Sequence, residues 1–441
     1  MIVESGAMDE NINDSSNYGK TAIAMALAQK EGVKITLPFI NEADFGFKPD
    51  TKNNCIIFGL KGINGINNDA VQAIIDNRPF TSLQDFETKL INTGYIKNSQ
   101  MLQLIKGGCF TKIDSEDRTV TMKKYLLDKV FKPCKELTLS QFNTMEELNI
   151  IPEQVSLSQR MVNFKKYVLS NEHLVELFID KNKAVPKKGY HDRYYTLDEN
   201  SQPFFTEHFT ENSIVKVQNG YYVISEKLFI KEADKYIQPL KDWMSSDEAL
   251  QVYNNANFQA CWDKYASGTP EAWSMHALNY YDNKHELEDI NEDKYGIVNF
   301  FDLPEIPEIY DTYNRMIGNE WKKMPKYQIT RIAGTVINSD NNHHTIHLLT
   351  QYGCVPVKFN KGAYSYYNKR ISEPNEKGVK KVLEESWFKR GTKLIITGTR
   401  LEQNFKPMRY NDTIYQHTCN KILEIYDDGD LLIASERVRT I

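Results

Sequence analysis

Cysteine is scarce in this chain of 441 residues, and its placement argues against the usual cysteine-based frameworks. The six cysteines are scattered, and no two of them form a C-x-x-C pair. Structural zinc is therefore not expected, and free thiols in a reducing compartment are the simpler interpretation. His343, His344 and His347 lie close together, but we expect them on a strand, where they lack the i, i+4 spacing of helical metal ligands. We predict no metal site.

Long apolar runs and secretion signals are missing as well. No apolar run approaches the ~18–20 residues that are needed to span a bilayer. Residues 1–17 are acidic and polar, and they lack the basic and apolar regions of a signal peptide. We therefore expect no membrane association and a cytoplasmic location.

Common catalytic and nucleotide-binding motifs are also absent. The chain contains no G-x-x-x-x-G-K-[ST] loop, no G-x-G-x-x-G on a strand–helix turn and no G-x-S-x-G elbow. The segment Tyr18 to Thr21 reads Y-G-K-T but lacks the first glycine of a phosphate-binding loop. We predict no catalytic residue in this chain.

The sequence is that of a globular protein with a locally basic C-terminal part. A charged fraction of 26% and a hydrophobic fraction of 41% are typical of such proteins, and the length allows roughly two to four domains. The net charge is −5, yet from Lys326 to Tyr426 there are 16 Lys and Arg against 8 Asp and Glu. A local basic face is sufficient for contact with phosphates.

The segment from Ile57 to Phe86 has the pattern of a helix-hairpin-helix. A short apolar run leads into a tight turn, where Gly65 supplies, and Asn67 can supply, a positive φ. An amphipathic helix follows, and Asn68 or Asp69 is expected to cap it. Such a turn directs N–H groups and the positive end of a helix outward, which seats a phosphate without reading bases. The residues predicted to bind DNA here are Lys61, Gly62, Gly65, Ile66, Asn67, Asn68 and Arg78.

The segment from Tyr327 to Ile425 has the element order of an OB-fold. We expect strands at 328–338, 344–350 and 354–359, a helix at 361–368, a charged insertion at 369–389, and strands at 392–401 and 414–425. OB-folds hold single strands by stacking bases on aromatic rings in a basic groove, at roughly 1–3 kcal/mol per base. The surface-facing residues predicted to bind DNA here are Arg331, Lys358, Tyr364, Tyr366, Tyr367, Arg370, Lys393, Arg400 and Arg409.

Each module also has a plainer interpretation. The hairpin pattern fits an ordinary αα-turn without a ligand, and the barrel pattern fits a protein-contact barrel with tyrosines on its rim. The co-occurrence of the two modules favours DNA binding.

The region from Arg118 to Lys323 is less informative. Helical periodicity occurs at 122–131, 157–167, 172–180 and 245–265, and Asn219-Gly220 predicts a type I′ turn between two strands, 214–218 and 221–225. Gln238 to Trp243 vaguely resembles the clamp-binding peptide Q-x-L-x-x-F. A core role for Leu240 and Trp243 is the favoured interpretation.

Several segments resemble the C-family replicative DNA polymerases, the bacterial DNA polymerase III α subunits. Gly32 to Asn41 is similar to the family's G-I-x-[IV]-x-x-P-x-I-N strand, and Ile57 to Asn67 to its I-x-x-G-L-x-x-I-K-G-V-G hairpin. Leu104 to Phe110 is similar to its L-I-x-A-G-A-F-D segment. Asn64 and Asn67 depart from the pattern, because the family has a lysine and a second glycine there.

A further resemblance lies downstream, where Leu278 to Leu287 has the spacing of the family's L-G-[FL]-Y-L-S-x-H-P-L element. In this element His285 is expected to be a packing or capping residue. The family's palm aspartates, P-D-x-D-x-D, hold two metal ions, and no such triplet occurs in this sequence. The resemblance therefore implies no cofactor in this chain and Mg²⁺ on a partner catalytic chain.

These observations together predict an α+β multidomain chain. The expected domains are an end-of-fingers region at 1–50, a helix-hairpin-helix domain at 51–117, a mixed helical region with a β-hairpin at 118–325 and an OB-fold β-barrel at 326–441. The chain's own Met1 favours a separate polypeptide from a split, phage-type gene, and a piece of a longer chain would look the same.

The expected function is that of the DNA-binding C-terminal part of a DNA-directed DNA polymerase. The hairpin would grip the duplex primer-template and the barrel the single-stranded template. Expected partners are this DNA, the catalytic polymerase chain and a sliding clamp, in a bacterial cell or phage-infected host. The alternatives are a stand-alone nucleic-acid-binding module of repair or recombination, and a structural protein in which both modules are relics.

Overall fold

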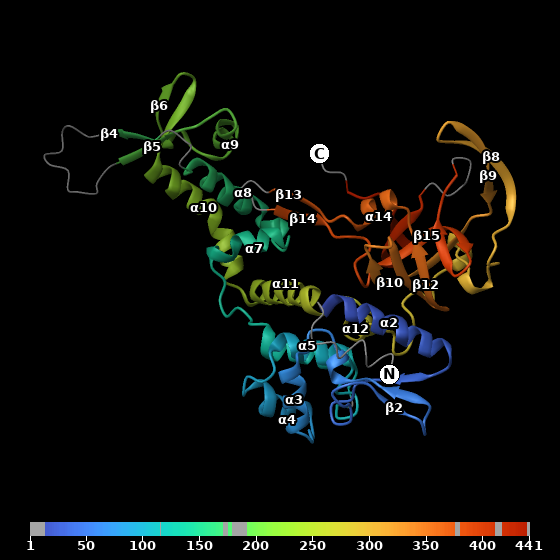
Figure 1. Cartoon of the computed structure of the whole chain (residues 1–441). Helices are drawn as coiled ribbons and strands as arrows, with labels where there is room; N and C mark the ends of the chain where they lie inside the picture. Colours follow the sequence, from blue (N-terminus) through green and yellow to red (C-terminus); the bar gives the residue numbers. More distant parts are fainter. Residues whose placement is uncertain are drawn as a thin grey trace. The chain divides into compact units, whose positions relative to one another are not determined.

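The computed structural model describes residues 14–114, 116–170, 175–178, 192–374, 380–410 and 417–438. The chain divides into two compact units, one formed by Met1–Tyr125 with Tyr265–Ile441 and the other by Leu126–Lys264. Helices alternate with several separate sheets (Figure 1), which confirms the predicted α+β class. Among the helices in these ranges, none combines the length and the hydrophobicity needed to cross a bilayer.

The first unit opens with a helix that packs on the C-terminal barrel. Helix α2 buries Ala22 and Ala26 against Ile337 and Leu349 of the barrel. A small sheet follows, in which β3 pairs in parallel with β1 and antiparallel with β2. The elements are α2 (Asp14–Lys30), β1 (Lys34–Thr36), β2 (Lys48–Asp50) and β3 (Cys55–Ile57).

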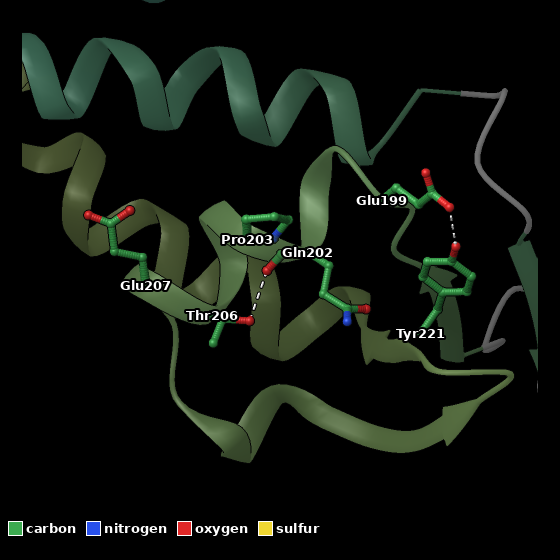
Figure 2. A pocket seen from close by; sticks show the side chains of 6 residues that line it. All are labelled: Glu199, Gln202, Pro203, Thr206, Glu207 and Tyr221. Atoms are coloured by element: carbon green, nitrogen blue, oxygen red, sulfur yellow. Dashed lines mark hydrogen bonds between the residues drawn. The ribbon is translucent and has the colours of Figure 1, made fainter.

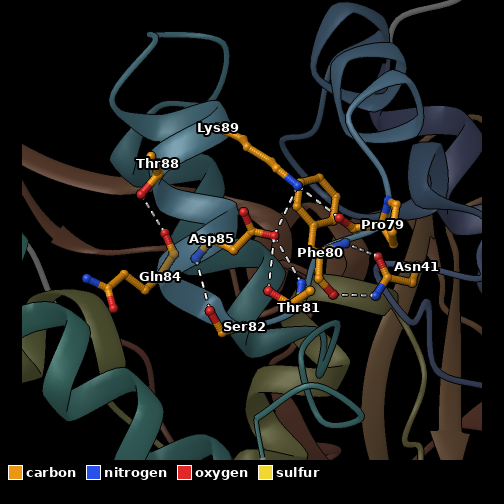
Figure 3. A network of polar contacts seen from close by, with 9 residues as sticks. All are labelled: Asn41, Pro79, Phe80, Thr81, Ser82, Gln84, Asp85, Thr88 and Lys89. Carbon is orange, nitrogen blue, oxygen red and sulfur yellow. Dashed lines mark hydrogen bonds and ion pairs between the residues drawn. The ribbon is translucent and has the colours of Figure 1, made fainter.

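The hairpin module is a cluster of short helices around three phenylalanines. The ring of Phe86 lies 4.8 Å from that of Phe80 and 5.0 Å from that of Phe110, between centroids. Figure 3 shows how Asn41 fixes Phe80, since its side-chain amide donates to the Phe80 carbonyl and accepts from the Phe80 N–H, both at 2.8 Å. Lys89 pairs with Asp85 at 3.0 Å in the same network. The elements are η1 (Leu60–Gly62), α3 (Asn68–Asp76), α4 (Leu83–Phe86), η2 (Glu87–Ile91), α5 (Asn98–Lys106) and α6 (Arg118–Tyr125).

The C-terminal barrel has the strand connections of an OB-fold. Strands β10, β11 and β12 form an antiparallel meander, β12 pairs in parallel with β16, β16 pairs with β15, and β15 closes the ring on β10. Helix α14 lies between the third and fourth strands, which confirms the predicted order. The elements are β10 (Thr330–Asp340), β11 (Thr345–Thr350), β12 (Gly353–Lys358), α14 (Lys361–Asn368), β15 (Lys393–Leu401) and β16 (Asn404–Pro407).

The fifth barrel strand is not the one that the sequence predicted. β16 closes the barrel, and β17 (Cys419–Ile425), within the range expected to do so, pairs with the first half of β15 and with β18 (Leu431–Ala434). Residues 411–416, which include the start of the predicted strand, lie outside the described residues. β16 has four residues and follows a tight turn in which Glu402 has a φ of +53°. So short a strand shows no alternation from which it can be recognised.

The segment before the barrel completes the barrel's core. Phe300 is buried with Ile332 and Phe405 in one core cluster, and Leu287 and Ile290 belong to a second cluster with barrel residues. A long two-stranded hairpin, β8–β9, follows, and a shorter one, β13–β14, lies within the predicted charged insertion. The elements are α12 (Pro270–Leu278), α13 (Glu292–Tyr295), η7 (Phe300–Asp302), β8 (Ile309–Ile317), β9 (Glu320–Tyr327), β13 (Ile371–Pro374) and β14 (Lys380–Glu384).

The second unit packs helices α8 and α10 against a small antiparallel sheet in the order β4-β5-β7-β6. The type I′ turn is confirmed, because Asn219 and Gly220 have φ of +53° and +86° between β6 and β7. The elements are η3 (Leu126–Val130), η4 (Leu139–Gln141), α7 (Phe142–Glu147), η5 (Glu153–Val155), α8 (Ser156–Val168), β4 (Val175–Phe178), β5 (Asp192–Thr196), α9 (Ser201–His208), η6 (Glu211–Ser213), β6 (Ile214–Gln218), β7 (Tyr221–Ser225), α10 (Glu226–Met244) and α11 (Asp247–Ala266).

Two sequence predictions for this unit are corrected or decided by the structure. The helix expected at 172–180 is wrong, because its described residues form strand β4. The clamp-like segment lies inside helix α10, where Leu240 is fully buried and Trp243 packs on the same core. The core interpretation of this segment is therefore confirmed, and a peptide inside a packed helix is not available to a clamp pocket.

An open hollow of about 560 Å³ lies on the second unit between α9 and the start of β7 (Figure 2). The Tyr221 hydroxyl donates to the Glu199 carboxylate at 2.9 Å at one end, and Glu207 lines the other end. Two carboxylates make this hollow unsuited to phosphate groups.

Candidate nucleic-acid interface

The turn of the hairpin has the conformation that the sequence predicted at Gly65 but a different helix cap. Gly65 is exposed and has a φ of +79°. Asn67 has a φ of −85° and is itself the N-cap of α3, since its Oδ1 accepts from the Ala70 N–H at 3.3 Å. The prediction that Asn68 or Asp69 caps the helix is therefore wrong. Gln100 adds a second hydrogen bond to Asn67 Oδ1 at 2.9 Å.

The turn presents a set of outward backbone donors. Gly65, Asn67, Asn68 and Asp69 are all exposed, and within the described part of the chain their N–H groups have no hydrogen-bond acceptor. Four such donors at the positive end of a helix form a seat for an anion. The Asp69 carboxylate lies in the first turn and weakens this seat, because it already interacts favourably with the helix dipole.

Lys61 lies at the turn, whereas Arg78 is engaged elsewhere. The Lys61 Nζ donates to the Ile66 carbonyl at 3.3 Å, which stabilises the turn and leaves other N–H donors of the ammonium group for a phosphate. Arg78 is half-buried and donates from Nε to the Ile40 carbonyl at 2.7 Å and from Nη2 to the Ala43 carbonyl at 2.6 Å. Its guanidinium therefore holds the 40–43 loop, which is a correction to its predicted position.

Gly62 and Ile66 are structural positions in the turn. A Cβ on Gly62 would lie 2.8 Å from Phe58 Cε1 and 2.9 Å from Phe47 Cζ, so only glycine fits between these rings. Ile66 is 1% exposed and its side chain belongs to the core. The buried Ile66 side chain is therefore not positioned to contact a ligand directly.

Asn64 connects the turn to the end of helix α12. Its backbone N–H donates to the Ala277 carbonyl at 2.8 Å, and its side-chain amide donates to the His276 carbonyl and to Asn279 Oδ1. Asn279 ends α12 in the left-handed conformation, with a φ of +64°. The two departures from the polymerase pattern thus have structural roles, because Asn64 satisfies carbonyls at the end of α12 and Asn67 caps α3.

A basic cluster surrounds the same helix end, and sequence reasoning missed it. Arg390 Nη1 donates to Asn279 Oδ1 at 2.5 Å. Burial, and then the positive charges of Lys106, Arg390 and Lys389, lower the pKa of His276. Three segments distant in sequence thus bring Lys106, Lys389 and Arg390 around His276, and we call these four residues the basic cluster. No local pattern in the sequence joins them.

A groove of about 680 Å³ includes the two C-terminal members of the basic cluster. It runs between helix α2 and the β10–β11 loop, and its cations and amides suit phosphate and sugar oxygens. Asp340 also lines it, but the Asp340 carboxylate is hydrogen-bonded to His343 Nδ1 at 2.7 Å. The polar residues of this groove are Lys20, Asn338, Ser339, Asp340, Asn341, Asn342, Lys389 and Arg390.

Three of the basic residues predicted on the barrel surface serve internal contacts. Arg331 Nη1 donates to the Tyr295 carbonyl at 3.0 Å, and Lys393 Nζ pairs with Glu286 at 2.7 Å. Arg400 is 9% exposed and donates to the Leu303 carbonyl at 2.7 Å. All three tie the barrel to residues 286–305, so their assignment to an open DNA-binding face is corrected.

Of the three tyrosines predicted at the barrel surface, two are buried and one is exposed. Tyr364 and Tyr367 are 3% and 7% exposed and pack in the barrel core against Phe388. The prediction that they face the surface is wrong, because α14 turns these two positions inward. Tyr366 is 52% exposed and lines a second hollow of about 700 Å³ together with Arg409 and His417.

Lys358 and Arg370 remain exposed as predicted. Arg370 lies 3.4 Å from Glu385 in an exposed ion pair, which contributes little to stability. Of the barrel residues predicted to bind DNA, Lys358, Tyr366, Arg370 and Arg409 are therefore the ones at the surface.

His285 is a packing residue, which confirms the prediction for it. Its Nε2 lies 3.0 Å from the Leu349 carbonyl, and its Nδ1 accepts from the Leu287 N–H at 3.0 Å. Both ring nitrogens are thus satisfied by a neutral imidazole, and burial lowers the pKa of His285 to about 4.

Comparison with known proteins agrees with this geometry. The family described as "Helix-hairpin-helix motif" matches residues 32–120, which confirms the hairpin. The chain is 39% identical over 445 residues to the "Probable DNA polymerase YorL" of Bacillus subtilis (strain 168), and the match covers 99% of this chain and 33% of the relative. The "DNA-directed DNA polymerase" of Bacillus phage SPbeta has the same identity and coverage. The chain is a homologue of these polymerases.

The homology has a defined extent. The chain spans about a third of the length of the curated relatives that it matches. It includes the whole matched hairpin region and the OB-fold barrel. The comparison thus extends over the turn, the basic cluster and the groove described above.

Proposed function

We propose that this chain is the DNA-gripping part of a DNA-directed DNA polymerase. The hairpin turn holds the backbone of duplex primer-template, and the barrel and its groove hold the single-stranded template. The names of the two homologous proteins support the polymerase assignment. The matched hairpin motif supports backbone contact with DNA.

One observation carries the proposal, which is the continuity of the turn with the basic cluster. Asn64 of the turn binds Asn279, Asn279 binds Arg390, and Arg390 lines the groove. The turn that carries the outward N–H groups of Gly65, Asn67, Asn68 and Asp69 is therefore linked by contacts to the Arg390 guanidinium. A DNA backbone needs such a succession of donors and positive charges, and needs no base-reading side chains.

The catalytic residues are assigned to another polypeptide. The sequence has no P-D-x-D-x-D triplet, and the residues that the structure describes hold no group of three His, Cys, Asp or Glu side chains arranged for a metal ion. We therefore place the catalytic aspartates and their Mg²⁺ on a partner polymerase chain. The present chain binds the DNA and positions it.

Salt-dependent DNA binding tests the grip. Fluorescence anisotropy with a labelled primer-template should give an affinity that falls steeply with salt, and Lys389→Gln should reduce the slope of log affinity against log salt by about 0.9. Lys231→Gln removes an exposed lysine from α10 in the second unit and should leave the slope unchanged. A parent chain that binds no DNA at low salt would refute the proposal.

Primer extension tests the catalytic assignment separately. The purified chain should not extend a primer. It should increase primer extension by a co-purifying protein that carries the aspartate triplet. Extension by the chain alone would contradict the assignment of catalysis to a partner. DNA binding without such a partner would favour a stand-alone repair or recombination module.

A further inference from the structure

The hairpin formed by β8 and β9 extends from a base that contacts Tyr410 of the barrel. At its base the Tyr327 N–H donates to the Tyr410 hydroxyl at 2.9 Å, and the ring of Tyr313 lies 6.2 Å from that of Tyr410. Beyond this base the strands are exposed along their length, and they appear as a long curved ribbon in Figure 1. We call residues 314–323 the arm tip.

The arm tip carries three exposed large apolar side chains, Met316, Ile317 and Trp321, and two of them lie on one face. Strand pairing places Met316 directly opposite Trp321, so the two side chains share one face of the ribbon. Trp321 is 68% exposed and Met316 is 54% exposed. An indole with this exposure gains free energy by stacking on a flat partner.

The charges of the arm tip favour an anionic partner. Arg315 lies directly opposite Lys322, and Lys323 opposite Asn314. Like charges directly across a strand pair are destabilising, so the Arg315–Lys322 pairing favours an anionic partner. The one acid of the tip, Glu320, lies 3.9 Å from Lys322 in an exposed pair, which offsets little of the repulsion.

We propose that the arm tip binds single-stranded nucleic acid, with Trp321 stacking on an unpaired base. Lys323 lies on the same face as Trp321, two residues further along β9, where it meets the phosphate next to that base. Arg315 and Lys322 on the opposite face of this thin ribbon add positive potential within a Debye length of the strand. Duplex DNA keeps its bases stacked inside and offers the indole no free face.

This inference rests on the proposed function, since it adds a second contact to a DNA-binding chain. The partner is nucleic acid rather than a protein surface, because the exposed ring is flanked by three cations and one acid. Aromatic rings beside cations are the combination that holds single strands without sequence preference. An apolar protein pocket would gain nothing from the Arg315–Lys322 repulsion.

The experiment compares three single variants of the full chain with the parent for binding to a labelled oligothymidine of about 20 nucleotides. Trp321→Ala should weaken binding at least about five-fold, whereas Trp321→Phe keeps a ring and should stay within about two-fold of the parent. Leu423→Ala on β17, where the side chain is 52% exposed, is the control for loss of exposed apolar surface. It should bind like the parent.

A second set of variants tests the charges, with the double variant Arg315→Gln/Lys322→Gln. This double variant should reduce the salt slope for the single strand by up to about 1.4, and its thermal stability should be equal to or above that of the parent because the repulsion is removed. Lys231→Gln/Lys235→Gln removes two exposed charges from α10 and should change neither quantity.

The outcomes separate this inference from the proposed function. If the parent binds primer-template and single strands but Trp321→Ala binds both like the parent, the arm inference is wrong and the DNA-gripping function stands. If Trp321→Ala instead loses only a co-purifying protein, the arm is a protein-contact element. If the parent binds no nucleic acid, both proposals fall.

Discussion

Replacement of Gly65 by valine tests the phosphate seat through backbone strain alone. Gly65 has a φ of +79°, and a Cβ added to it would meet only Gln103 Cγ, at 3.7 Å. A Cβ at this position therefore causes no collision, and the expected cost comes from placing an L-residue in the left-handed region. This cost is about 1–2 kcal/mol for an ordinary residue and about 1–3 kcal/mol for strained positions in general.

We expect Gly65→Val to lose about 1–3 kcal/mol of the free energy of unfolding or to relieve the strain by reshaping the turn. Either response moves the outward N–H groups, so duplex affinity should fall at least about ten-fold, as expected for loss of hydrogen bonds to a charged group. Gly65→Asn should cost less in both quantities, because asparagine tolerates the left-handed conformation.

Gly94 provides a matched control. It is exposed, has a φ of +83° and has open space where a Cβ would stand, and it belongs to the same module. Gly94→Val should lose a similar free energy of unfolding in urea denaturation and keep the duplex affinity of the parent by anisotropy. A folded Gly65→Val protein with parent affinity, or an equal loss of affinity in Gly94→Val, would refute the phosphate-seat reasoning.

Three further predictions concern the barrel. Lowering the pH from about 6.5 to 4 should remove up to about 3 kcal/mol of unfolding free energy, because the folded pKa of His285 is about 4 and the unfolded chain takes up the proton first. In His285→Gln, the urea midpoint of unfolding should depend less on pH between these two values. Tyr366→Ala should weaken single-strand binding about five-fold or more with little effect on stability, whereas Tyr367→Ala should lose about 3–5 kcal/mol of stability in urea. A fragment of residues 284–441 should unfold at higher urea concentration than one of residues 327–441, because residues before 327 fill part of the barrel's core.

Several elements of this protein could be predicted from local sequence patterns. Asn219-Gly220 specifies its turn because both residues accept a positive φ. Gly65 does the same for the hairpin, and the β-branched alternation of β10 and β11 identifies the meander. Each of these signals lies within about ten residues and depends on backbone preferences or on side-chain period.

The roles of the basic and aromatic residues could not be predicted in this way. In the sequence, three internal cations look the same as cations at the surface. Each of these residues, Arg331, Lys393 and Arg400, bonds to a group on residues 286–305. Whether an arginine faces solvent or a distant carbonyl depends on a partner far away in the sequence. Helix α14 likewise buries Tyr364 and Tyr367 and exposes Tyr366, which depends on the face that packs on the barrel.

By itself, the sequence determined the hairpin turn and the order of the barrel strands as far as β15, and its resemblance to the polymerase family indicated a packing or capping role for His285. The tertiary structure decided which strand closes the barrel, which cations remain at the surface, and that Lys106, Lys389 and Arg390 gather around His276. The physical reason is the distance along the chain over which each effect acts. Turn and strand preferences act between neighbouring residues, whereas burial and charge clustering arise only when segments hundreds of residues apart come into contact.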